Sequence, residues 1–282
     1  MSKICVIISK IEELELDCNS FIIGLKNFNS LNTLELGIDE IKNVKEKYKN
    51  KEIYISINKV IHDSEINELK ILIQKLNDVK VSGIIFDDLG VYNIIKNLNI
   101  NIPLIWGNIH QTTNYITINE WNKLGVENVI TSPEITIKEI KEIQDNTKSK
   151  LFIPIYGMFE IFSSNRFLLT NYLKYIYNEK VTDKYYLKHN ETNYPIFEDK
   201  TGTHIIDGKI LNGLNELKNL NNSRDDYLLI NSYMINNIEE VINIIKNNKG
   251  EKVIMLNENE YDGFLNKETF YKVKSSDNNE RK

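Results

Sequence analysis

The sequence has no alanine and only two cysteines, Cys5 and Cys18, among its 282 residues. A secreted disulfide scaffold is not expected at this length and cysteine count. One chain with two cysteines also cannot supply the four thiolates of an iron–sulfur site. Cys5 lies in an apolar run, which favours a buried structural thiol. The missing alanine accompanies many Asn, Ile and Lys residues, a composition typical of an A- and T-rich genome that says nothing about chemistry.

Arginine and long hydrophobic runs are scarce as well. Only Arg166, Arg224 and Arg281 are arginine, and 35 Lys and Arg are interleaved with 40 Asp and Glu, for a formal net charge of −5. Proteins that bind nucleic acid unaided usually present a basic stripe, so this balance argues against autonomous RNA or DNA binding but leaves room for a local patch. No run approaches the roughly 20 apolar residues of a membrane span. The N-terminal run ends at Lys10, too early for a secretory signal, and we expect a cytoplasmic protein without a membrane segment.

What the sequence has in quantity is short apolar runs that alternate with amphipathic segments. Seven strands are predicted before residue 157, at residues 4–9, 20–24, 52–58, 82–87, 102–106, 127–131 and 151–156. Apolar residues spaced three and four apart predict helices at residues 64–77, 89–98, 119–124 and 134–147. Alternating strands and helices indicate parallel βα units. The prediction is an α/β fold, a single TIM-barrel-like (β/α) domain, with an open doubly wound sheet as the alternative.

The pattern changes in the second half of the chain. Residues 174–193 are polar, tyrosine-rich and without a clean period, which predicts an irregular excursion from the barrel. After it we predict strands at residues 202–206, 227–230 and 252–256 and a helix at 235–247. We expect one domain over residues 1–274 and a disordered polar tail over 275–282.

Polar residues that follow the strands are the candidate site, because function in a βα barrel lies at the carboxyl ends of strands. These residues are Asn58, His62, Asp87, Asp88, Gly107, Asn108, His110, Gln111, Asn114, Tyr156, Glu160 and Arg166. Asp87 and Asp88 could form an acid/base pair or hold a cation, but adjacent strand residues point to opposite faces. A helix cap is therefore favoured for one of them. His110 could be a general base or a metal ligand. No second His or Cys stands at ligand spacing, so a structural role is favoured and no metal site is predicted.

Common catalytic motifs are absent from the sequence. No P-loop, GxGxxG, HExxH or GxSxG pattern occurs. The Ser163–Ser164 pair has no histidine nearby in the sequence, and no nucleophilic triad can be assembled.

Five segments, in order along the chain, share a family pattern. They are SGIIFDDLGVYNII (82–95), TTNYITINEWNKLGVENVITSPEITIKEIKEI (112–143), IYGMFEIFSSNRFLLTNYL (155–173), NYPIFEDKTGTHII (193–206) and YDGFLNKETFYKVK (261–274). Together they resemble the collagenase-like peptidase family U32, whose hallmark runs approximately HGAxCxxxSGRCxxSNY. The matching hallmark positions are Gly157, Met158, Ser164, Arg166, Leu169, Asn171 and Tyr172. The resemblance is closest to a short Gram-positive branch that is the first of two adjacent paralogues.

The chain departs from the resembled family at its cysteines. Glu160 stands where the first hallmark cysteine falls, Phe167 where the second falls, and Tyr156 replaces the hallmark histidine. The resemblance implies that hydroxylating members hold an iron–sulfur cluster with such cysteines. We therefore expect no cofactor in this chain, since the cluster ligands are missing.

The resemblance implies three functions. The short and long paralogues are linked to 5-hydroxyuridine at the tRNA wobble position, which makes this chain a cluster-free subunit of such a hydroxylation system in our leading hypothesis. Its partner would be a cysteine-bearing U32 paralogue, and tRNA would be contacted through the complex. The alternatives are a U32-type peptidase, which needs a nucleophile or metal the sequence does not display, and a non-catalytic scaffold or pseudoenzyme.

Candidate site residues under any of these functions are those that the motifs retain. Arg166 is expected to bind a carboxylate or phosphate bidentately, with a structural salt bridge as the alternative. Glu198 and Asp199 either order a loop, which is favoured, or bind a polar ligand. Asn114 and Asn171 are expected to satisfy backbone groups near the barrel mouth. The catalytic candidates are Arg166, Glu160, His110 and Asp87.

Overall fold

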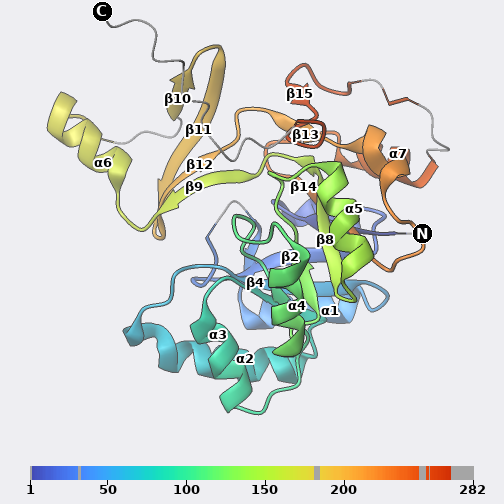
Figure 1. Ribbon diagram of the computed structural model, residues 1–282. Coiled ribbons are helices and arrows are strands. Elements are labelled where there is room, and N and C mark those ends of the chain that lie inside the picture. Colours follow the sequence, from blue (N-terminus) through green and yellow to red (C-terminus); the bar gives the residue numbers. More distant parts are fainter. Residues whose placement is uncertain (1, 31–32, 181–184, 248–251, 254, 268–282) are drawn as a thin grey trace, which may run out of the picture.

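Eight parallel strands close into a barrel. The computed structural model describes residues 2–30, 33–180, 185–247, 252–253 and 255–267. Strand β14 pairs in parallel with both β1 and β8, which closes the ring (Figure 1). The ring consists of β1 (Lys3–Ile7), β2 (Ser20–Leu25), β4 (Glu52–Ile57), β5 (Gly83–Phe86), β6 (Leu104–Trp106), β7 (Asn128–Ile130), β8 (Lys150–Gly157) and β14 (Tyr227–Asn231). The predicted barrel is confirmed, with its first seven strands near the predicted positions.

Helices cover the outside of the barrel between successive strands. They are α1 (Ile38–Lys47), α2 (Ile66–Val79), α3 (Leu89–Asn97), α4 (Tyr115–Lys123), α5 (Ile137–Asn146) and α7 (Ile238–Asn247), with short 3₁₀ turns η1 (Ile11–Glu15) and η2 (Asp63–Glu65). Leu69, Ile73 and Leu76 of α2 are fully buried, so the apolar stripe expected from their spacing faces the barrel. Within the described residues, no helix is both long and apolar enough to cross a membrane.

Aromatic side chains fill the barrel interior near the amino ends of the strands. The rings of Phe152 and Tyr227 stack with centroids 4.2 Å apart, and Tyr54 packs edge-on against both. The hydroxyl groups of Tyr54 and Tyr227 lie 2.9 Å apart, so these buried polar atoms are hydrogen-bonded. Cys5 belongs to the same buried cluster. The polar part of the interior is therefore left to the carboxyl ends of the strands.

An arginine-centred network joins the last barrel strand to the one before it. Arg224 donates hydrogen bonds to the carbonyl oxygens of Gln144 (2.9 Å), Thr147 (2.8 Å) and Ser149 (2.6 Å). Its Nε also lies 2.8 Å from the buried carboxylate of Asp226. The guanidinium therefore bridges α5, the segment before β8 and the start of β14, where the barrel closes.

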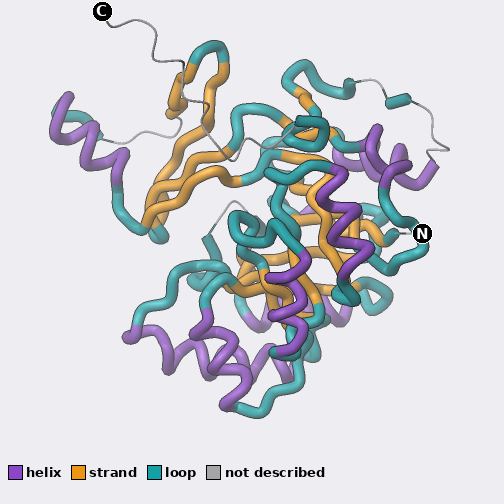
Figure 2. The backbone as a smooth tube through the Cα atoms, in the orientation of Figure 1, coloured by secondary structure: helices purple, strands orange, loops and turns teal. Residues whose placement is uncertain are grey.

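The chain leaves the barrel between β8 and β14. A separate antiparallel sheet, ordered β10-β11-β12-β9, extends away from the barrel (Figures 1 and 2). Its strands are β9 (Glu160–Ser164), β10 (Tyr185–His189), β11 (Thr192–Asp199) and β12 (Gly202–Ile206). Helix α6 (Leu168–Tyr172) follows β9 and continues into a π-helical turn, η3 (Leu173–Tyr177). The short elements β3 (Glu35–Leu36), β13 (Ile210–Asn212), η4 (Leu214–Asn219) and β15 (Glu260–Tyr261) complete the described fold.

Two details differ from the sequence prediction. The excursion expected over residues 174–193 exists, but its described part is regular and holds η3, β10 and the start of β11. Most of β10 is solvent-exposed, so the strand has no alternating apolar pattern. The strand predicted at 252–256 is wrong, because the described residues there form no strand. The tail at 275–282 lies outside the described residues.

Candidate functional site

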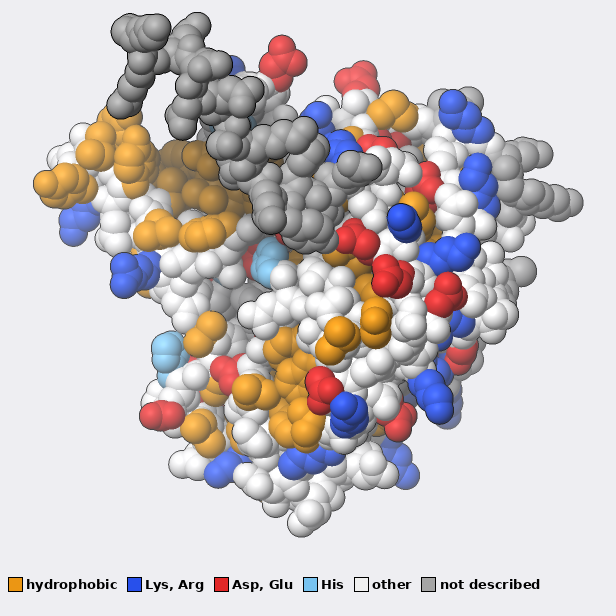
Figure 3. Space-filling model, in the orientation of Figure 1, with side chains coloured by type: hydrophobic (Ala, Val, Ile, Leu, Met, Phe, Trp, Pro, Cys, Tyr) orange, Lys and Arg blue, Asp and Glu red, His pale blue; other side chains and the backbone are white. Residues whose placement is uncertain are grey.

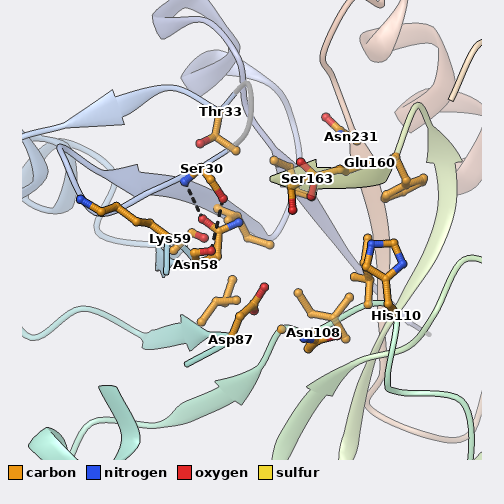
Figure 4. A pocket seen from close by; sticks show the side chains of 18 of the residues that line it. Ser30, Thr33, Asn58, Lys59, Asp87, Asn108, His110, Glu160, Ser163 and Asn231 are labelled. Carbon is orange, nitrogen blue, oxygen red and sulfur yellow. Dashed lines mark hydrogen bonds between the residues drawn. The ribbon is translucent and has the colours of Figure 1, made fainter. Parts of the chain in front are cut away.

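A cavity of about 280 Å³ opens at the carboxyl ends of the barrel strands. Isoleucine and leucine side chains of the strands line its floor. Polar side chains from the strand ends and from β9 line its walls, with Asp87 and Asn108 facing Glu160 and Ser163 across the space (Figure 4). An apolar pocket with a few converging polar groups is the usual form of a small-molecule site.

Strand alternation separates the two adjacent carboxylates at the end of β5. Ile85 packs inside the barrel, so Asp87, two residues later, points into the cavity. Asp88 turns toward α3, where its Oδ1 accepts a hydrogen bond from the backbone N–H of Gly90 at 2.6 Å. The predicted helix cap is therefore confirmed for Asp88, and the two carboxylates do not form a pair.

Asp87 is held in an unusual environment. Its Oδ1 atom is buried and has no hydrogen-bond partner among the described residues, and the same is true of Oδ1 of Asn108. Gly107 makes room for the carboxyl group, because a Cβ there would lie 2.6 Å from Oδ1 of Asp87. Burial, and then the negative charges of Glu160 and Asp88, raise the pKa of Asp87 to about 7. This group can therefore gain or lose a proton near neutral pH, as a general acid or base must.

Glu160 is fixed by a buried histidine across the antiparallel sheet. Nδ1 of His204 lies 2.9 Å from Glu160 Oε2, and Nε2 lies 2.8 Å from the hydroxyl oxygen of Thr201. That hydroxyl donates to Asp199, whose carboxylate is 3.6 Å from Nε2. Burial opposes the charged imidazole, but Asp199 and Glu160 outweigh it and raise the pKa of His204 to about 9. A protonated His204 on β12 therefore holds Glu160, which lies on the neighbouring strand β9 and lines the cavity.

Further contacts hold the rest of the cavity wall. The backbone N–H of Ser30 donates to Asn58 Oδ1 at 2.9 Å, which ties the segment after β2 to the end of β4 (Figure 4). Lys59 forms an ion pair with Glu65, so its charge is already matched. Asn231 donates from Nδ2 to the carbonyl oxygen of Met158 at 2.8 Å. These polar groups are held in place by protein partners before any ligand enters.

The structure brings together about half of the strand-end residues nominated from the sequence. Those that line the cavity are Asn58, Asp87, Asp88, Gly107, Asn108, His110 and Glu160. His110 is exposed at the rim. The others lie outside the cavity lining: His62, Gln111, Asn114, Tyr156 and Arg166. The roles of the cavity residues stay predictions.

Arg166 and Asn171 lie on the excursion and not at the barrel mouth. Arg166 is exposed just before α6, and its hydrogen bonds are made by its backbone: its carbonyl oxygen accepts from the hydroxyl of Thr203 at 2.7 Å, and its N–H donates to Ser164 Oγ at 3.3 Å. Its guanidinium has no carboxylate within 4.0 Å among the described residues, so the structural salt bridge is not found there. Asn171 is exposed on α6. The segment leaves the barrel at β9, which carries both residues away from the cavity.

Four other predicted residues have structural contacts. Asn114 caps α4 by accepting the backbone N–H of Thr117 at 2.9 Å, on the barrel exterior. Tyr156 is buried and donates to Glu260. Glu198 accepts the backbone N–H of Thr170 at 3.0 Å as well as the N–H of Leu169. Glu198 therefore orders the start of α6, as the favoured prediction had it, and Asp199 likewise orders the turn before β12.

Sequence reasoning missed His204, Ser30, Lys59 and Asn231. His204 lies in an apolar strand 44 residues from Glu160, and no spacing rule connects the two. Lys59 and Asn231 each stand at or just beyond the end of a barrel strand, and the strand-end rule could have found them.

The arrangement supports proton transfer and hydrogen bonding more than nucleophilic or metal chemistry. No group of three or more His, Cys, Asp or Glu side chains in the described part of the chain could hold a metal ion. Ser163 lines the cavity, but the nearby His204 has both nitrogens engaged, by Glu160 and Thr201. It is thus not available as the base that a serine nucleophile needs. The peptidase alternative stays a prediction with no observation in its favour.

Comparison with known proteins fixes the family. The sequence profile described as peptidase family U32 matches residues 14–263, which is most of the chain. The chain belongs to peptidase family U32. The predicted resemblance is thereby confirmed, and this U32 protein carries the family's motifs on a barrel with an inserted sheet.

Several curated relatives have names that refer to tRNA. The chain is 29% identical over 176 residues to "tRNA hydroxylation protein P2" of Bacillus subtilis, covering 60% of this chain and 57% of that protein. It is 29% identical over 147 residues to "tRNA hydroxylation protein P" of Haemophilus influenzae, covering 52% and 31%. It is 24% identical over 121 residues to "tRNA hydroxylation protein P1" of Bacillus subtilis, covering 43% and 29%. The aligned part thus spans little more than half of the first relative and less than a third of the other two.

The two cysteines of this U32 protein lie away from the cavity. Cys5 is buried inside the barrel, and its strand neighbour is Ser20, the first residue of β2. Cys18 is buried just before β2, so both thiols lie toward the amino ends of the strands. Burial raises the pKa of Cys18 to about 11 and that of Cys5 further. An iron–sulfur cluster at the mouth does not fit this donor set, since thiolates are its usual ligands.

Proposed function

We propose that this U32 protein is a subunit of a tRNA wobble-uridine 5-hydroxylation system and does not itself hold the iron–sulfur cluster. The observation that carries the proposal is the position of Glu160. This residue replaces the first hallmark cysteine of the resembled family, lines the cavity and is engaged by protonated His204. An internal ion pair at the position of that cysteine supports a subunit without a cluster.

A second component follows from the same reasoning. Hydroxylation needs an oxidised cofactor or an activated donor of the hydroxyl group. This chain has no thiolate near its cavity that could hold such a cofactor. Two of the relatives, named P1 and P2, occur in one organism, which supports a system of more than one U32 chain. The expected partner is a cysteine-bearing U32 paralogue that supplies the cluster.

Nucleoside mass spectrometry of bulk tRNA tests the function. Deletion of the gene is expected to remove wobble 5-hydroxyuridine and its derivatives, and the wild-type gene should restore them. Complementation with Asp87→Asn shows whether the cavity takes part. Loss of the nucleoside with this variant indicates a working site, and full restoration indicates a scaffold role. An unchanged profile in the deletion strain, in a background without a redundant pathway, refutes the proposal.

Iron analysis tests the cluster-free part separately. The purified chain should contain no stoichiometric iron or sulfide after anaerobic reconstitution, whereas the paralogue, treated alike, should contain both. Stoichiometric iron in this chain alone would contradict that part of the proposal and leave its place in tRNA hydroxylation open to the nucleoside test.

A further inference from the structure

Residues 161–190, the part of the insert that holds α6, η3 and β10, differ in charge from the rest of the chain. This segment contains five Lys or Arg residues and two Asp or Glu residues, a net charge of +3, within a chain whose formal net charge is −5. The remainder therefore carries −8. The cations in its described part are Arg166, Lys174, Lys180 and Lys188, and none has a carboxylate within 4.0 Å among the described residues. No carboxylate of the described residues therefore competes with an external anion for these four side chains.

The same segment exposes aromatic rings. The four most exposed tyrosines of the described residues are all on it: Tyr172, Tyr175, Tyr177 and Tyr186, with Tyr175 89% exposed. Phe167, at the start of α6, is 48% exposed. Figure 3 shows hydrophobic side chains gathered where α6 lies in Figure 1, with basic side chains beside them. Flat rings in water next to unpaired cations are the two components of a surface that binds single-stranded nucleic acid.

The π-helical turn η3 gives this surface its geometry. Residues five apart lie on one face of a π-helix, because its hydrogen bonds run from i to i+5. Tyr172 and Tyr177 accordingly meet, with ring centroids 5.8 Å apart. Tyr172, Lys174 and Tyr175 also border a shallow open groove. An α-helix would rotate Tyr177 away from Tyr172, so the turn concentrates rings on one side.

The segment begins at the cavity. Glu160 and Ser163 of β9 line the barrel mouth, and Phe167 opens α6 only four residues after Ser163. A strand lying on α6 could therefore run along β9 toward the cavity. Aliphatic residues such as Ile176 are exposed here too, but a protein-binding face would not need this excess of unpaired cations.

We propose that α6, η3 and β10 form a surface that binds single-stranded RNA directly, with bases stacking on Tyr175 and its neighbours and phosphates on Lys174 and Arg166. The choice of RNA as the ligand rests on the proposed function. The surface would let an acidic protein contact a polyanion, because residues 161–190 carry a net charge of +3 while the rest of the chain carries −8.

Fluorescence anisotropy with two labelled RNA probes tests the surface. The probes are a 12-nucleotide uridine-rich single strand and a blunt duplex of equal length, each titrated with the full-length chain at low salt. We expect the single strand to bind more tightly than the duplex. Tyr175→Ala should weaken binding about tenfold, since stacking on one ring contributes about 1–3 kcal/mol, and Tyr175→Phe should restore it. Lys174→Ala should reduce the salt dependence, whereas the exposed Lys49→Ala, outside the surface, should leave both unchanged.

Two outcomes would overturn the surface proposal. One is wild-type protein that binds neither probe, or binds both equally whatever residue stands at 175. The other is a concentration-dependent dimer, seen by analytical ultracentrifugation, that Tyr175→Ala abolishes while RNA binding persists; this would make the surface a protein interface. RNA binding in vitro needs no hydroxylation, so normal binding with unchanged nucleosides in the deletion strain refutes only the proposed function. Absent binding with lost hydroxyuridine refutes only this surface.

Discussion

The substitution Asp87→Asn removes the charge of the buried carboxyl group but keeps its shape, and so isolates the effect of that charge on stability. The pKa of Asp87 is raised to about 7 from its ordinary value of 3.8, so the folded chain binds this proton more tightly than the unfolded chain does. The free energy of unfolding therefore falls as pH rises from about 4 to about 7, and the loss is complete above that range. Asparagine has nearly the same size and carries no charge, so the variant should escape this loss.

The size of the effect follows from the pKa difference. At 1.36 kcal/mol for each pH unit, the full difference corresponds to about 4 kcal/mol. Oδ1 of Asp87 is buried, but the residue retains some surface toward the cavity, and solvent there reduces the penalty. We expect Asp87→Asn to be more stable than the wild type by about 2 kcal/mol at pH 8.5, with no such gain at pH 4.5.

Urea unfolding followed by tryptophan fluorescence at several pH values measures this difference. Asp145→Asn, which removes an exposed carboxylate on α5, controls for the loss of one negative charge. A gain for Asp87→Asn that appears between pH 4.5 and 8.5, beyond any gain in the control, supports the buried-proton account. Parallel pH profiles for the wild type and Asp87→Asn would refute it, and with it the argument that Asp87 is ready for acid–base chemistry.

Three further predictions concern stability. The pKa of His204 is raised to about 9 from an ordinary 6.5, and the resulting stabilisation is present below about pH 6.5 and lost as pH rises through about 9. Urea unfolding should therefore show that His204→Gln lowers the free energy of unfolding by about 3 kcal/mol at pH 6 and by much less at pH 10. Arg224→Ala leaves the buried carboxylate of Asp226 without its cation and should lower the free energy of unfolding by about 3 kcal/mol. Arg224→Lys should recover little of this stability, because an ammonium cannot reach three carbonyl groups at once. Gly107→Ala places a Cβ 2.6 Å from Asp87 Oδ1 and should lower the urea midpoint by the equivalent of about 1–3 kcal/mol; an unchanged midpoint would mean that Asp87 moves freely.

The barrel could be predicted from the sequence because its strands are buried on both faces. A strand such as β4, with five of six residues buried, appears as a continuous apolar run, and helices with a single apolar stripe separate such runs. The antiparallel sheet gives no comparable pattern. Strands β9 and β10 are mostly exposed, so neither alternation nor a run marks them. The strand predicted at 252–256 is the opposite error, an apolar run whose described residues form no strand.

The candidate site was predictable where chain order and space agree. Asp87 could be nominated because a barrel places strand ends around one mouth and alternation turns one of two adjacent residues inward. Arg166 was nominated by the same rule, but β8 leads into β9, and the chain leaves the barrel before it reaches that residue. His204 contacts Glu160 from 44 positions away, through the pairing of β9 with β12. Such a contact depends on the register of a sheet that local pattern does not reveal.

Glu160 connects the family pattern to the local electrostatics. A cysteine at this position, as in the resembled hallmark, can bind a metal but matches a cationic imidazole only as a thiolate. A glutamate binds the imidazole directly, and the His204 it engages belongs to β12 of the inserted sheet. The contact thus joins β9, which lines the cavity, to β12, its neighbour in the inserted sheet. The same carboxylate adds to the effect of burial in raising the pKa of Asp87, so Glu160 also favours the protonated form of the acid across the cavity.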